Sequence, residues 1–279
     1  MPMARFEAVE VTAHQAFFLA DYLSAGMFPW KLAITGPYVD PSERGPFNER
    51  CLAELTEAGV IDPQGRVKPT VAESVRTVCQ ANQWLEWLTV VDADQILRGV
   101  LARTSAPEVV VALRYAQMVT FTPLQLTHSG DVVPIICAGL PPDQPPAQFN
   151  EFELGMDIGK QIDERIARGA DIVDTLTDLG VPERDAEVME MARTGNRITV
   201  ELTAHEATNG ARHQTDVSVN LISTELGLIL VSPPAGEQPR EGGTSVFTPA
   251  EPFAVSMAVR DLTARLPSGT WFPNENYDI

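Results

Sequence analysis

Cysteine, histidine and cationic side chains are scarce in this sequence. Its three cysteines, Cys51, Cys79 and Cys137, have the spacing of neither a zinc knuckle nor a CxxC pair, which is typical of the reducing cytoplasm. With 20 Lys and Arg against 38 Asp and Glu, the formal net charge is −18, which would repel nucleic acid phosphates and anionic membrane surfaces. No stretch approaches the ~20 apolar residues that span a bilayer, and the N-terminus has no apolar run of signal-peptide length. We therefore expect a soluble cytoplasmic protein that binds neither nucleic acid nor membrane.

Motifs for catalysis or metal binding are absent or incomplete. The segment 155–161, GMDIGKQ, resembles a phosphate loop, but its spacing is one residue short and the Ser or Thr that binds magnesium is missing. His205 and Glu206 begin like a zinc-protease motif that lacks its second histidine. Because strand register would put His205 and His213 on opposite faces of a hairpin, both are predicted to lie at the surface. The expectation is a protein without catalytic residues, metal or cofactor.

Two similar halves can be read from the pattern of helices and strands. A capping box at Thr12 and Gln15 predicts a first helix, and a region of β-branched and aromatic runs from Trp84 to Phe121 predicts an antiparallel sheet. Further helices are predicted from Pro46 to Gly59, around Val71, Val75 and Val78, around Ile158, Ile162 and Ile166, before Gly180, and after Pro182. Strands return at Arg197. The prolines at 141, 142, 145 and 146 predict a stiff connector.

A hairpin is predicted at Asn209 and Gly210, a pair that suits a two-residue type I′ turn. The turn sets a register in which apolar residues face apolar residues and polar face polar. The apolar pairs are Ile198 with Leu221, Val200 with Val219, and Leu202 with Val217; the polar pairs are Thr199 with Asn220, Glu201 with Ser218, and Thr203 with Asp216. Val200 and Val217 are therefore predicted to be in the core, and the polar set to face outward.

A short internal repeat in the sequence supports a repeated architecture. Phe121, Thr122 and Pro123 recur as Phe247, Thr248 and Pro249, and Leu-Pro follows at the same offset in both copies. We predict a pseudo-twofold α+β protein with an N-terminal half at 1–140, a connector at 141–149 and a C-terminal half at 150–279. The two halves are expected to form one compact domain.

Several longer segments carry a family resemblance. They are FPWKLAITGPY (28–38), LRGVLART (97–104), VVALRYAQMVTFT (110–122), AQFNEF (147–152), GARHQTDVSVNLISTELGLILVSP (210–233) and WFP (271–273). Together they resemble the EspG family of ESX secretion-associated proteins, in family order over nearly the whole chain. Gln148 and Asn150 stand where relatives more often carry Arg and Asp, and the loop from Pro234 to Gly243 is poorer in aromatics. The resemblance favours the branch attached to the iron-linked ESX system.

The resemblance implies both a fold and a function. It implies a quasi-twofold central antiparallel sheet flanked by two helical bundles, and a chaperone that binds the apolar tip of a PPE protein within its PE/PPE heterodimer. Covering such a tip removes an aggregation-prone patch, and polar contacts around it select the partner. The free chaperone is expected to be a monomer or weak homodimer.

The same resemblance suggests which residues contact the cargo. In the family, the cargo contacts the sheet together with the C-terminal helical bundle. The corresponding residues of this chain are Arg103, Glu201, Thr203, Asp216, Ser218, Asn220, Leu226, Leu228 and Ser232. Glu201 and Asp216 would pair with basic cargo residues, and Leu226 and Leu228 would supply an apolar anchor. Two other readings stay open: a small-molecule enzyme whose polar residues meet only in the fold, and a structural subunit of a homo-oligomer.

Overall fold

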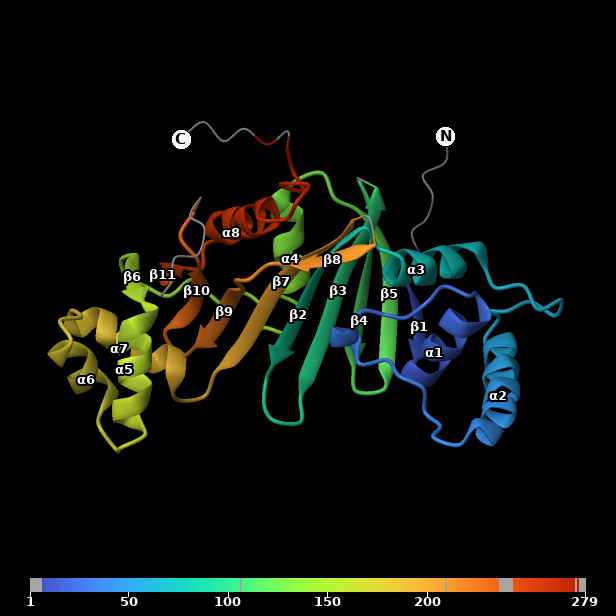
Figure 1. The fold of residues 1–279 in the computed structure, drawn as a ribbon, viewed down its shortest axis with the longest axis horizontal. Helices are drawn as coiled ribbons and strands as arrows, with labels where there is room; N and C mark the ends of the chain where they lie inside the picture. The colour runs from blue at the N-terminus through green and yellow to red at the C-terminus, as the bar shows by residue number, and fades with distance from the viewer. Residues whose placement is uncertain (1–6, 106, 209, 236–242, 274, 276–279) are drawn as a thin grey trace. The chain divides into compact units, whose positions relative to one another are not determined.

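The computed structural model describes residues 7–105, 107–208, 210–235, 243–273 and 275 (Figure 1). The chain divides into two compact units. Unit 1 contains 1–88, 95–127 and 205–213, and unit 2 contains 89–94, 128–204 and 214–279. The strand β7 (Ile198–Thr208) contributes its first residues to unit 2 and its last to unit 1. The division at a 141–149 connector stays a prediction.

The described strands form one eleven-stranded sheet in the order β1-β5-β4-β3-β2-β7-β9-β10-β11-β6, with β8 paired to β7. The remaining strands are β1 (Val9–Thr12), β2 (Gln83–Val90), β3 (Ile96–Ser105), β4 (Glu108–Tyr115), β5 (Met118–Gln125), β6 (Phe152–Gly155), β8 (Ala211–Gln214), β9 (Val219–Thr224), β10 (Gly227–Ser232) and β11 (Thr244–Pro249). Neighbouring pairs such as β4 with β5 and β9 with β10 are antiparallel, as predicted.

The structure contains the three helices predicted for unit 1, and the second begins at Arg44, two residues before the predicted Pro46. They are α1 (Ala13–Tyr22), α2 (Arg44–Glu57) and α3 (Pro69–Cys79), with short 3₁₀ turns η1 (Trp30–Leu32) and η2 (Pro41–Glu43). At the start of α1, Gln15 N–H donates to Thr12 Oγ1 at 3.2 Å and Thr12 N–H donates to Gln15 Oε1 at 2.9 Å. This confirms the predicted capping box, which supplies acceptors for two donors that a helix start leaves unpaired.

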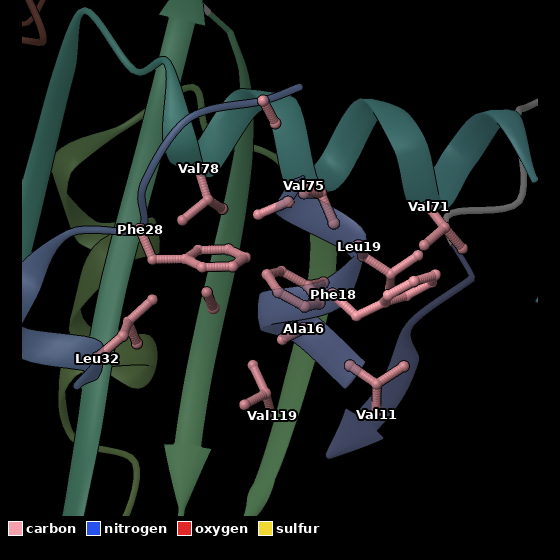
Figure 2. Packing of buried hydrophobic residues seen from close by; sticks show 14 of the residues in the cluster. Val11, Ala16, Phe18, Leu19, Phe28, Leu32, Val71, Val75, Val78 and Val119 are labelled. Carbon is pink, nitrogen blue, oxygen red and sulfur yellow. The ribbon is translucent and has the colours of Figure 1, made fainter. Parts of the chain in front are cut away.

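The core of unit 1 lies between these helices and one face of its strands. Figure 2 shows Val71, Val75 and Val78 pointing from α3 toward Leu19 of α1 and Phe28. The valines recur at helical spacing and are nearly inaccessible to solvent. Their burial confirms the predicted apolar face of the third helix.

Unit 2 also packs helices on strands. Its helices are α4 (Val133–Ile136), α5 (Met156–Ile166), α6 (Ile172–Asp178), α7 (Glu183–Arg193) and α8 (Pro252–Ala264), with the 3₁₀ turn η3 (Ser129–Val132). The helices α5, α6 and α7 enclose a core with Phe247 of β11 and Ile229 of β10. No helix in the described ranges is long and apolar enough to span a membrane.

Within unit 2, the Pro-rich segment is hydrogen-bonded to the start of β10. Leu228 N–H donates to Pro145 O at 2.9 Å, and Ala147 N–H donates to Leu228 O at 3.0 Å. Gly227, with φ of +117°, lies so close that an added Cβ would stand 2.6 Å from Pro145 O. This contact requires glycine at position 227 both for its backbone angle and for space.

The hairpin register predicted for β7 and β9 is wrong by two residues. Val200 pairs with Leu221, Glu201 with Asn220, and Leu202 with Val219. Near the hairpin end, Thr215 N–H donates to Ala204 O at 2.9 Å, as the predicted register requires. Between the pair Leu202–Val219 and the pair Ala204–Thr215, the strand that leads into β9 has two more residues than β7. Because side chains alternate between the two faces of a strand, a register shift of two residues does not change the face to which each side chain points. Asn209 of the proposed turn lies outside the described residues.

The predicted apolar face is retained although the pairs are not, whereas the prediction that the polar set faces outward is wrong for Thr203, which is 5% exposed. Val200, Leu202, Val219 and Leu221 are each about 1% exposed, which confirms the apolar face. Val217 is only half-buried, because it falls in the irregular segment between β8 and β9.

The short internal repeat accompanies a repeated order of helices and strands. Each half contains a strand, three helices, then strands that return in order: β1-β5-β4-β3-β2 in the first and β6-β11-β10-β9-β7 in the second. Phe121 pairs with Val9 of β1, and Phe247 pairs with Phe152 of β6, so the repeated phenylalanines occupy equivalent strands. The α+β class with an antiparallel sheet and two sets of helices is confirmed.

Candidate partner-binding groove

One face of the unit 2 strands is only partly covered by helices. Cross-strand pairing puts Thr199 opposite Ile222, Glu201 opposite Asn220, and Asn220 opposite Val231. All of these side chains lie on the face against which α7 packs at β9. Because side chains alternate between faces, Val200 and Leu221 point the other way and are buried.

A groove of about 350 Å³ lies on this face, between the strands and the helices α5 and α7. We call it the α5/α7 groove; Leu154, Gly155, Gly159, Lys160, Asp163, Met189, Ala192, Arg193, Thr199, Asn220, Ile222, Val231, Ser245 and Phe247 line it. Its strand side carries the apolar side chains Ile222, Val231 and Phe247. Such a groove, apolar within and polar at the edge, suits an apolar protuberance of a protein partner.

The helix side of the groove is charged. Arg193 of α7 and Asp163 of α5 form an ion pair at 2.6 Å that joins the two helices. Lys160, one turn before Asp163 on α5, is exposed at the same wall. The segment that resembles a phosphate loop therefore begins a helix along this groove, with Gly155 as its N-cap residue and no side-chain cap.

Four of the predicted contact residues lie on the groove-side face or its continuation. Asn220 lines the groove, Glu201 beside it is exposed, and Ser218 accepts a hydrogen bond from Asn220 Nδ2 at 3.1 Å. Thr203 follows Glu201 on the same face but is only 5% exposed. Glu201 is therefore the most accessible residue of this set, and Asn220 and Ser218 are half-buried.

Three other predicted residues lie elsewhere in unit 2. Leu228 and Ser232 alternate with Ile229 and Val231 along β10, so they point to the opposite face, and Leu228 is 8% exposed. Leu226, in the turn between β9 and β10, is 51% exposed. Of the two leucines expected to anchor cargo, only Leu226 presents a large apolar surface.

The remaining two predicted residues differ in their surroundings. Asp216 is exposed in the irregular segment before β9. Arg103 belongs to unit 1, where its Nε donates to Gln83 Oε1 at 2.8 Å and burial lowers the pKa of the guanidinium to about 10.

The prediction that His205 lies at the surface is wrong, whereas His213 is exposed as expected. His205 stacks on Trp84 with ring centroids 5.1 Å apart, and its Nε2 lies 3.6 Å from Glu86 Oε2. Burial, with Lys31 and Arg212 nearby, lowers the pKa of His205 to about 4. The polar alternation of the sequence did not reveal that β2 supplies an aromatic and a carboxylate partner.

Sequence reasoning missed the apolar part of the groove. Ile222 was assigned no role because the predicted register left it beyond the hairpin pairs, and Lys160 was considered only as part of a phosphate loop. Strand alternation from Asn220 could have found Ile222. Lys160 reaches the same surface only through the packing of α5, which no local pattern predicts.

Comparison with known protein families matches the family model described as EspG family to residues 12–261. The chain belongs to the EspG family. Among its relatives are the ESX-3 secretion-associated proteins EspG3 of Mycolicibacterium smegmatis, 45% identical over 96% of this chain and 90% of that protein, and of Mycobacterium tuberculosis, 39% identical over 96% and 94%. The ESX-1 secretion-associated protein EspG1 of Mycolicibacterium smegmatis is 26% identical over 97% of this chain and 92% of that protein.

The EspG fold is also found among solved structures. The chaperone EspG5 of the Mycobacterium tuberculosis type VII secretion system, in its complex with the PE25–PPE41 dimer, matches with a TM-score of 0.79. The match covers 95% of this chain and 99% of that one at 20% identity. Conservation of the fold at this identity accords with the antiparallel sheet and helices described above.

Proposed function

We propose that this EspG protein is a cytoplasmic chaperone that binds the PPE subunit of a PE/PPE heterodimer and directs it to an ESX secretion system. The observation that carries the proposal is family membership across residues 12–261, with a structural relative that is a chaperone bound to a PE–PPE dimer. The higher identity to the EspG3 proteins than to EspG1 supports an ESX-3 type of system.

The α5/α7 groove is the proposed site for the apolar tip of the cargo. Its strands offer Ile222 and Val231 as apolar contacts, while Asn220 and Glu201 stand beside them as polar contacts. Apolar surface buried in the centre contributes affinity, and polar groups around it contribute selectivity. We propose Leu226 and Asp216, both exposed, as outer contacts; Arg103 and Ser232 stay in the predicted set without a place in this groove.

A binding role, with no bond made or broken, agrees with the groove chemistry. Its acidic residue Asp163 is held in the ion pair with Arg193. Its strand side offers an amide, hydroxyls and hydrocarbon. These groups recognise a surface by shape and hydrogen bonding, as a chaperone for an aggregation-prone tip requires.

Co-expression with PE/PPE pairs tests the function. Tagged chain produced with pairs from its own ESX locus should retain a PE/PPE heterodimer in a pull-down, and pairs from other loci should be retained less. Failure to retain any pair from its own locus would remove the proposal.

Groove variants test the site. Ile222→Asp and Asp216→Arg should each weaken cargo retention by about tenfold or more, since a desolvated charge or a reversed charge opposes binding. Asn48→Arg on α2, also half-buried, is the matched control and should retain cargo. Circular dichroism should show that all variants are folded. Unchanged cargo binding by both variants would show that the cargo binds elsewhere on the protein.

A further inference from the structure

A second groove lies in unit 2, on the sheet face opposite to the α5/α7 groove. It has a volume of about 520 Å³ and runs between α8 and the strands β10, β11 and β6. We call it the α8 groove; it is lined by Glu151, Glu153, Leu230, Ser232, Pro233, Pro234, Ala235, Val246, Thr248, Phe253, Ala254, Met257, Ala258 and Asp261. Leu230 and Ser232 alternate with Val231, which lines the other groove, so the sheet separates the two.

The helix side of the α8 groove presents an apolar stripe that ends in a carboxylate. Phe253, Met257 and Asp261 recur four residues apart on α8, a spacing that places them along one face of the helix. Phe253 is 58% exposed and Met257 is half-buried. An exposed phenylalanine beside methionine in a groove is an apolar surface that a partner can cover.

The strand side adds two more carboxylates. Glu153 is exposed on the edge strand β6, and Glu151 just before it accepts a hydrogen bond from Thr248 Oγ1 at 3.0 Å. Burial raises the pKa of Asp261 above its ordinary value, although Arg260 and Arg265 oppose the shift. Arg265 also donates to Pro234 O at 3.0 Å. Glu151, Glu153 and Asp261 thus add negative charge around apolar side chains, and a cation brought to Asp261 would offset its cost of desolvation.

We propose that the α8 groove is a second docking surface, which receives a segment of another protein that carries apolar side chains next to lysine or arginine. Charge complementarity selects this occupant: the apolar side chains cover Phe253 and Met257, and the basic side chains meet the three carboxylates. A second copy of this chain is a poorer occupant, because a formal charge of −18 on each copy opposes association. The inference is independent of the proposed cargo site, which lies on the other face.

Fluorescence anisotropy on the full chain tests the docking surface. The probe is a labelled amphipathic helical peptide of leucine and lysine, compared with a peptide of the same charge in which serine replaces leucine. The leucine peptide should bind at least about tenfold more tightly than the serine peptide. Glu151→Lys with Glu153→Lys should weaken the leucine peptide about tenfold, and Phe253→Ser should weaken it as well.

The matched control separates a site from general attraction to an acidic protein. Glu49→Lys with Glu57→Lys on α2 makes the same change of net charge at exposed positions and should change the affinity little. Equal loss in the control pair, or equal binding of the serine peptide, would overturn the proposal. Self-association that the groove variants abolish would assign the surface to a second copy instead. Loss of PE/PPE retention by the same variants would show that the α8 groove is part of the cargo site and would contradict the proposal of a second, independent surface.

Discussion

Glu86 is a buried carboxylate whose placement packing alone does not explain. It is 1% exposed on β2, and its Oε1 accepts a hydrogen bond from Trp84 Nε1 at 2.7 Å. Burial raises the pKa of this carboxyl, although the Trp84 hydrogen bond and the charges of Lys31 and Arg212 oppose the shift. Taking a carboxylate out of water is costly, so its charged form is destabilising at high pH.

Glu86→Gln should therefore stabilise the protein, and more at pH 8 than at pH 5. A raised pKa in the folded state means that the contribution of Glu86 to stability is complete below its unfolded pKa and is lost as pH rises through its folded pKa. Glutamine keeps an acceptor for Trp84 and does not titrate. Urea unfolding at the two pH values should show a gain in the free energy of unfolding that is larger at pH 8 than at pH 5. A gain that is larger at pH 5 would contradict this account.

Gly99 illustrates a constraint set by a neighbouring strand. A Cβ at this position of β3 would lie 2.0 Å from Cε2 of Trp87, a fully buried indole. Gly99→Ala should therefore lower the free energy of unfolding by about 1–3 kcal/mol, because the ring must move within a packed core. Thermal unfolding measures the change. Gly45→Ala, where an added Cβ meets nothing within 4 Å, is the control and should have little effect.

At the scale of the element, the pair β7 and β9 combines a buried face with the face proposed to bind cargo. Val200 and Glu201 are adjacent, yet one is 1% exposed and the other is exposed. Val200→Asp should cost about 3 kcal/mol or more, because it buries an unpaired charge, and should lower the yield of folded protein. Glu201→Lys should leave thermal unfolding nearly unchanged and weaken cargo retention. If Glu201→Lys unfolds the protein, the face that carries Glu201 is also needed for folding, and this prediction is contradicted.

At the scale of the whole molecule, high net charge and an exposed apolar groove have opposite effects on association. A charge of −18 keeps copies of the chain apart, whereas an uncovered apolar groove would favour contact with another protein. Light scattering should therefore find the free chain as a monomer or weak homodimer. With cargo it should find one chain for each PE/PPE heterodimer. A stable higher oligomer of the free chain would favour the structural-subunit reading.

Local chemistry in the sequence was enough to determine most elements. The capping box at Thr12 and the valine spacing of α3 each act over a few residues, and they predicted two helices and a buried face correctly. The alternation along β7 predicted the burial of Val200 and Leu202, but it did not predict that Thr203 and His205 are buried as well. The order of helices and strands in the two halves followed from the same local signals and the short internal repeat at Phe121 and Phe247.

Only the tertiary structure decided which side chains meet. The two extra residues before β9 changed the pairs of Val200 and Glu201, because a local irregularity alters register without altering the faces. His205 is buried because β2 brings Trp84 and Glu86 beside it, and Lys160 joins Ile222 at one groove because α5 packs beside these strands. Such contacts join residues far apart in the chain, and their geometry depends on packing that local sequence patterns do not specify.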